Sequence, residues 1–311
     1  MLGETIALIV AVLWTTGALY GELATKRLGA LPLNVIRMVL TLLMLGAALW
    51  FMVGHPYPYM ADGETWMWLS LSGFMGFGFG DYCLFNSYQL IGSRFSQLFM
   101  TLAAPFAALS AWFLLGENMT MLGLVGMVVT LTGIGMSVMS KPQTEGHKHI
   151  SVKLPIQGII YGIGAALGQG VGLVLSKVGL EHYTDSTTLE AGTSSFMYPV
   201  SGTMIRALTG LVCFLFLLII KGKVGKLSVA VRDGKGMKYA LFATFLGPAL
   251  GVSLSLLAVQ YASAGVAQTL MSLTPVLIIW PSYIVFKTKV TAMEVFGAII
   301  AVCGAALFFV H

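Results

Sequence analysis

The second half of this 311-residue chain repeats its first half, and the charges of equivalent loops are reversed. When residues 76–133 are laid over 247–304 without a gap, nine of 58 positions are identical. Two apolar halves with opposite charge bias are typical of membrane transporters built from inverted repeats. The identical residues are Gly76/Gly247, Gly80/Gly251, Gln89/Gln260, Gln97/Gln268, Met100/Met271, Leu102/Leu273, Thr120/Thr291, Gly126/Gly297 and Gly133/Gly304.

The composition independently indicates a chain that resides in a lipid bilayer. Hydrophobic residues make up 57% of the chain and charged residues only 9%, whereas soluble domains have about 25% charged residues. The net charge of +5 is carried by the loops, as expected for a protein that faces anionic lipid. No pattern of basic and aromatic residues suggests nucleic acid as a partner. The three cysteines have neither disulfide nor metal-ligand spacing, and we expect no cofactor.

The apolar stretches predict ten transmembrane helices. A hydrocarbon core about 30 Å thick requires roughly 20 apolar residues per helix, and ten segments meet this requirement. We therefore expect an all-α membrane protein with two inverted five-helix repeats. The expected spans are 4–26, 33–53, 66–90, 95–115, 119–140, 155–177, 199–220, 239–261, 263–286 and 291–310.

The division into halves follows from the same pattern. The first repeat is expected over 1–140, a polar linker over 141–154, and the second repeat over 155–311. The loop 54–65 has no lysine or arginine, whereas its counterpart 221–238 has six. This reversal is how one five-helix unit is inserted in two orientations.

Lysines and arginines gather in alternate connections between the expected helices. Fourteen of the 17 lie in the odd-numbered connections, and the even-numbered connections and both termini have none. Because basic loops remain on the cytoplasmic side, we expect this face to be cytoplasmic and both termini to lie outside.

The segment from Pro105 to Gly133 resembles the drug/metabolite transporter superfamily, in its EamA-type form with two EamA repeats. It reads P-F-A-A-L-S-A-W-F-L-L-G-E-N-M-T-M-L-G-L-V-G-M-V-V-T-L-T-G. Its matching residues are Pro105, Gly116-Glu117, Thr120, Gly126 and Gly133, echoed by Pro275, Thr291, Gly297 and Gly304. The resemblance implies ten helices and a small metabolite, amino acid or drug-like compound as the solute. Family members usually have cytoplasmic termini, which differs from the charge count, and we prefer the charge count.

Two pairs of polar residues are candidates for the solute-binding site. Gln97 and Thr101 lie one turn apart on the expected fourth helix, and Gln268 and Ser272 occupy equivalent positions on the ninth. In the resembled fold these helices border the central cavity, where transporters bind their solutes. The alternative is that these side chains only bond to neighbouring helices. Trp14 is a further candidate for the cavity wall, with packing as its alternative.

Asp81 is the costliest residue to place, because it lies near the middle of the third expected helix. A carboxylate there costs about 2.5–3.5 kcal/mol unless it faces protein or water. Tyr88 and Gln89 share its helix face and join the candidate site. We expect Asp81 to couple transport to protons, and the alternative is a structural carboxylate that is neutral or paired with an arginine.

Arg37 and Arg206 lie some four to eight residues inside the second and seventh expected helices. One interpretation is that both snorkel to the membrane surface. The other is that they recognise an anionic group such as a carboxylate or phosphate.

These features together predict a secondary active transporter that works by alternating access, with two five-helix units rocking about a central site. We expect an exporter with proton coupling or exchange, acting as a monomer or homodimer in the cell inner membrane. A lipid or lipid-linked sugar flippase of the same fold is the first alternative. A membrane enzyme is a weaker one, because the sequence has no metal-binding or nucleophile motif.

Overall fold

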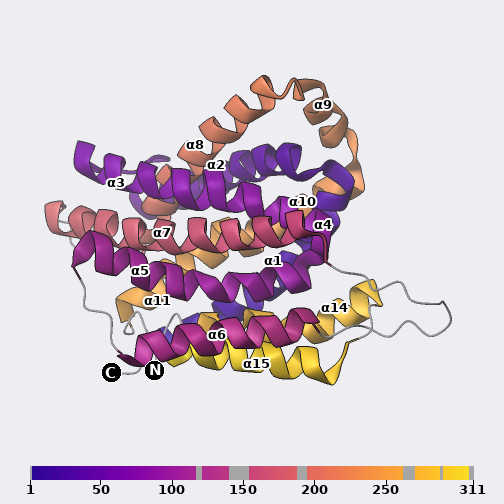
Figure 1. Ribbon diagram of the computed structural model, residues 1–311. Coiled ribbons are helices and arrows are strands. Elements are labelled where there is room, and N and C mark those ends of the chain that lie inside the picture. Colours follow the sequence, from indigo (N-terminus) through magenta and orange to yellow (C-terminus); the bar gives the residue numbers. More distant parts are fainter. Residues whose placement is uncertain are drawn as a thin grey trace.

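The protein folds as a bundle of helices in the computed structural model, which describes residues 2–116, 121–139, 154–187, 195–261, 270–287 and 290–307 (Figure 1). Within these ranges the regular structure is helical, and no strand occurs. The elements are α1 Leu2–Leu28, α2 Ala30–Val53, α3 Gly63–Gly73, η1 Phe74–Asp81, α4 Tyr82–Phe99, η2 Met100–Leu102, α5 Ala103–Leu115, α6 Met121–Met139, α7 Ile156–Ser186, α8 Met197–Ile220, α9 Val224–Arg232, α10 Gly234–Thr244, η3 Phe245–Val252, α11 Ser253–Tyr261, α13 Thr274–Leu277, α14 Ile279–Phe286 and α15 Ala292–Leu307.

Seven described helical segments are long and apolar enough to cross a membrane, and two shorter apolar helices cover Thr274–Phe286 and Ala292–Leu307. The segment Gly63–Leu114 has 52 residues, which corresponds to roughly 78 Å of helix and exceeds one crossing. Gly92 interrupts it with a non-helical backbone conformation, φ 78° and ψ 166°, and the segment is long enough for two crossings, one on each side of Gly92. The all-α membrane fold is thus confirmed, and the count of ten helices stays a prediction.

The repeat is visible in the boundaries of the helices. Adding 171 to the residue numbers of α3 and η1 gives the limits of α10 and η3. Both η1 and η3 are π-helical, a form that is rare and often occurs at functional sites. The same shift relates Asp62 and Asp233, whose carboxylates each cap the helix that follows.

Helices α6 and α15 are equivalent in the two halves and pack against each other in antiparallel directions (Figure 1). A Cβ added to Gly133 would lie 2.3 Å from the Ala301 nitrogen, and one added to Gly304 would lie 2.4 Å from the Thr130 nitrogen. Ser137, near the end of α6, donates a hydrogen bond to the carbonyl of Glu294 at the start of α15 at 2.9 Å. Because equivalent helices run in opposite directions, the repeats are inverted. Small residues permit such close approach in membranes.

The two halves interlock through their first helices. Helix α1 packs against α10, η3 and α11 of the second half, and α7 packs against α3, η1, α4 and α5 of the first half. Gly168 of α7 lies against the backbone of Gly80, and Gly172 lies against Gly76. The repeats in the sequence are therefore not two separate bundles in space.

Basic residues from several odd-numbered connections gather at one end of the bundle. Arg27 binds Asp233 at 2.8 Å, and Lys26 lies over the ring of Phe286. Arg94 binds Glu294 at 2.7 Å. These contacts bring the ends of α1 and α14 and the bend at Gly92 within α4 together with the starts of α10 and α15, as the charge pattern predicted. That this end faces the cytoplasm remains a prediction.

Candidate functional site

A cavity of about 100 Å³ lies between segments of both halves. Five of the residues expected at the site line it. These residues are Trp14, Gln97, Thr101, Arg206 and Ser272. The structure thus brings the first-half pair Gln97 and Thr101 together with Ser272 of the second half. Gln268, the fourth member of the expected set, lies outside the described residues.

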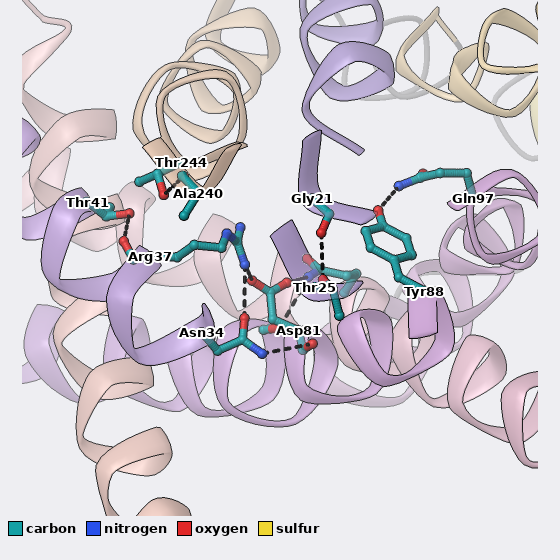
Figure 2. Close-up of polar contacts among 12 residues, drawn as sticks. Gly21, Thr25, Asn34, Arg37, Thr41, Asp81, Tyr88, Gln97, Ala240 and Thr244 are labelled. Atoms are coloured by element: carbon teal, nitrogen blue, oxygen red, sulfur yellow. Dashed lines mark hydrogen bonds and ion pairs between the residues drawn. The ribbon is translucent and has the colours of Figure 1, made fainter. Parts of the chain in front are cut away.

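Gln97 and Thr101 line the cavity, but their side chains also have partners within the protein. The Gln97 amide donates a hydrogen bond to the Tyr88 hydroxyl at 2.7 Å (Figure 2). Tyr88 is buried and packs edge-on against Phe85, so it holds Gln97 from behind the cavity wall. The Thr101 hydroxyl donates to the carbonyl of Leu98 at 2.7 Å.

Gln89 is placed elsewhere. Its amide donates to the carbonyl of Thr25 at 3.3 Å, and it lines a second hollow with Arg27 and Lys221 at the basic end. Gln89 lies eight residues after Asp81, roughly 12 Å further along the helix axis. The structure places it at the basic end and not at the central cavity.

Asp81, the last residue of η1, is buried and pairs with Arg37 of α2 (Figure 2). The Arg37 Nη1 lies 2.9 Å from the Asp81 Oδ2 and also donates to the Asn34 Oδ1 at 3.1 Å. The Arg37 guanidinium lies 4.2 Å from the centre of the Phe85 ring. The geometry is therefore that of the alternative considered above, a carboxylate paired with an arginine.

Gln169 of α7 connects this ion pair to the cavity. Its Nε2 donates to the Asp81 Oδ1 at 3.0 Å and to the carbonyl of Gly76 at 3.2 Å, and its side chain lines the cavity. Sequence reasoning missed Gln169. The feature that could have identified it is its position as an isolated amide between Gly168 and Gly170, in an otherwise apolar, glycine-rich segment.

Arg206 lies on α8 and reaches the cavity from the second half. Its exposed fraction is 4%, and that of Arg37 is 5%, so the interpretation that both snorkel to the membrane surface is wrong. The Arg206 guanidinium lies 5.0 Å from the centre of the Phe77 ring. Among the described residues, its buried Nε has no hydrogen-bond partner.

The two arginines occupy nearly symmetrical environments. A Cβ added to Gly76 would lie 2.8 Å from the Arg206 Nη2, and one added to Gly247 would lie 3.6 Å from the Arg37 Nη2. Gly76 and Gly247 are equivalent in the repeat, and each admits the arginine of the other half. The symmetry is broken at Asp81, because its counterpart is Val252.

Comparison with solved structures shows a shared fold. One solved structure, described as "Crystal structure of protein", is similar over 98% of this chain and 95% of its own, with a TM-score of 0.55 and 15% sequence identity. No curated protein matches the chain. The model of the EamA-like transporter family matches residues 1–139 and 156–310. Since this match spans nearly the whole sequence and both of its halves, the protein belongs to the EamA-like transporter family.

Proposed function

We propose that this membrane transporter is a secondary carrier that moves a small metabolite, amino acid or drug-like solute by alternating access, as an exporter. The observation that carries the proposal is the cavity between the halves, lined by Gln97, Thr101 and Ser272 together with Arg206. Polar groups from both halves around one internal cavity are what a single central site requires. Gln268 completes this set by its position in the repeat.

In the proposed site, the polar residues bind the solute and the apolar residues give it shape. Gln97 and Ser272 offer hydrogen-bonding groups from opposite halves, and Trp14 provides an aromatic wall. The buried contact with Tyr88 restricts the rotation of Gln97, which lowers the entropy lost on binding. Because α1 and α7 each pack against the opposite half, we propose that each moving unit includes the first helix of the other sequence repeat.

We further propose that Asp81 couples transport to protons. Protonation of Asp81 would weaken its pairing with Arg37 at 2.9 Å and would release Gln169, which shares the carboxylate and lines the cavity. The protonation state of Asp81 is in this way linked to the shape of the solute site. The carrier is proposed to act as a monomer or homodimer in the cell inner membrane, with its basic end in the cytoplasm.

The test is solute flux into proteoliposomes driven by a pH gradient. Counterflow first identifies a solute from a panel of amino acids, organic anions, nucleosides, sugars and cationic dyes. We then expect Asp81→Asn to abolish the flux driven by the pH gradient while solute binding persists. Asp62→Asn is the matched control, since Asp62 is a carboxylate outside the cavity, and it should keep driven flux.

Three results would contradict this proposal. Unchanged driven flux in Asp81→Asn would remove Asp81 from the coupling mechanism. If a pH gradient does not alter the flux, transport is not coupled to protons and solute exchange is the mechanism instead. Absence of flux for every soluble solute, with accelerated movement of a fluorescent phospholipid between the leaflets, would instead favour the flippase alternative.

A further inference from the structure

Six charged side chains are buried among the described residues, and three are carboxylates. Each carboxylate has a cation of its own. Glu22 pairs with Lys26, Asp81 with Arg37 and Glu294 with Arg94. Arg206 is the buried cation that remains without an ion-pair partner in the described part of the chain.

The surroundings of Arg206 make this excess charge costly. Arg206 is the tenth residue of α8, roughly 14 Å along the helix axis and therefore deep in the bilayer. A charged side chain at that depth is strongly disfavoured unless an opposite charge or water compensates it. Asp81 attracts it electrostatically, but that carboxylate is already bound by Arg37 and Gln169. With Asp81 ionised, Arg37, Arg206 and Asp81 together carry one excess positive charge.

The guanidinium of Arg206 is also arranged to meet a ligand. It borders the cavity, its buried Nε has no hydrogen-bond partner among the described residues, and its Nη2 packs against Gly76, where a Cβ would come within 2.8 Å. A planar guanidinium recognises carboxylates through two parallel hydrogen bonds. One excess positive charge is neutralised by one negative charge, which favours a monoanion over a dianion.

We infer that Arg206 binds the carboxylate of a monoanionic organic solute, an inference that rests on the transport function proposed above. Much of the remaining cavity wall is apolar, formed by Met100, Leu173, Leu256 and Met271. These side chains suit the hydrocarbon portion of such a solute. Gln97 and Ser272 then bind any further polar group that it carries.

The inference has a consequence for the transport cycle. The loaded site is electrically neutral, whereas the empty site retains the unpaired charge of Arg206. Because an uncompensated charge is poorly tolerated inside the membrane, the loaded carrier reorients faster than the empty one. Exchange of one monocarboxylate for another should therefore be faster than net efflux.

The experiment compares carboxylates with their uncharged amides of nearly equal shape. Phenylacetate and phenylacetamide, isovalerate and isovaleramide, and N-acetylleucine and N-acetylleucinamide are titrated into the purified protein in nanodiscs, and binding is measured by calorimetry. We expect at least one carboxylate to bind roughly ten- to hundredfold more tightly than its amide, as for a hydrogen-bonded charge. Counterflow of the same pairs in proteoliposomes measures their transport.

Two variants separate recognition of charge from general damage to the cavity. Arg206→Gln should reduce the ratio of carboxylate to amide affinity to about one, and Arg206→Lys should retain part of it. Gln97→Leu is the matched control: it alters the cavity wall without altering charge and should weaken both members of a pair alike. The comparison on the wild-type protein needs no variant, so a variant that fails to fold leaves the test intact.

The outcomes distinguish this inference from the transport function. If the amides bind and exchange as well as the carboxylates, or if neutral solutes alone are carried, the anion site is wrong and the carrier function stands. If Arg206→Gln keeps the wild-type ratio of carboxylate to amide affinity, another residue recognises the carboxylate and the role given to Arg206 is wrong. If counterflow of every solute, charged or neutral, is no faster in proteoliposomes than in protein-free liposomes, the proposed transport function is wrong and this inference is wrong with it.

Discussion

Asp62 and Asp233 are equivalent residues of the two halves, and they cap helices at opposite ends of the bundle (Figure 1). The Asp62 carboxylate accepts a hydrogen bond from the Thr65 backbone at 2.9 Å, and Asp233 accepts one from Gly236 at 3.0 Å. Each also binds a basic residue from the first helix of the other half. Asp62 contacts His182 at 2.8 Å, and Asp233 contacts Arg27 at 2.8 Å.

These two contacts should respond differently to pH. Hydrogen bonds from Thr65 and His182 lower the pKa of Asp62, and the hydrogen bond from Arg27 lowers the pKa of Asp233. The stability that each carboxylate contributes is therefore present above its ordinary pKa of about 3.9 and is lost as the pH falls through its lower folded value. On the alkaline side only the Asp62 pair loses its cation, because histidine ordinarily titrates near pH 6.5 and arginine does not titrate in this range.

We therefore expect the start of α3 to lose protection as the pH rises above about 6.5, the ordinary histidine value, while the start of α10 keeps it. The measurement is hydrogen–deuterium exchange of the two helix starts, corrected for the intrinsic exchange rate. His182→Arg is the control and should remove the pH dependence at α3. An equal response at both ends, or one that persists in His182→Arg, would show that this pair is not the titrating contact.

The packing of α6 against α15 predicts that alanine substitution at two glycines of α6 has different effects on stability. Gly133→Ala should destabilise the protein, because its Cβ would lie 2.3 Å from the Ala301 backbone nitrogen and the two helices would have to separate. Overpacking of this kind costs about 1–3 kcal/mol. Gly135→Ala is the matched control, since a Cβ there has nothing within 4 Å among the described residues. Thermal unfolding in detergent measures both variants, and equal melting temperatures would contradict the close packing.

The buried pair of Arg37 and Asp81 predicts non-additive effects on stability. Arg37→Gln or Asp81→Asn alone leaves one buried charge without its partner, which costs about 3–5 kcal/mol. The double variant should lose less than the sum of the single variants, by 1 kcal/mol or more, because no uncompensated member of the pair remains. Reversible unfolding in mixed micelles gives the three free energies of unfolding. Strict additivity would mean that the two side chains do not interact in the membrane.

Several features followed from the sequence because they depend on local composition. Runs of apolar residues predicted membrane helices, and the alternation of lysine and arginine predicted which connections meet at one end. Identity at a spacing of 171 residues predicted the repeat, which reappears in the limits of η1 and η3. Gln97, Thr101 and Ser272 were candidates because polar residues recur at equivalent positions of the two repeats, and Arg206 because an arginine inside an apolar helix can recognise an anionic group.

Only the tertiary structure decided which of these polar residues meet. Arg37 and Arg206 lie at similar positions in equivalent helices, yet Arg37 takes Asp81 as its ion-pair partner and Arg206 remains free to face the cavity. Gln169 reaches Asp81 across 88 positions of the chain, and Gln89, on the same helix face, reaches the basic end instead. The choice of partner depends on how helices distant in the sequence cross, since an ion pair forms only where two side chains come within a few ångströms. Hydropathy and spacing along one helix contain no information about that distance.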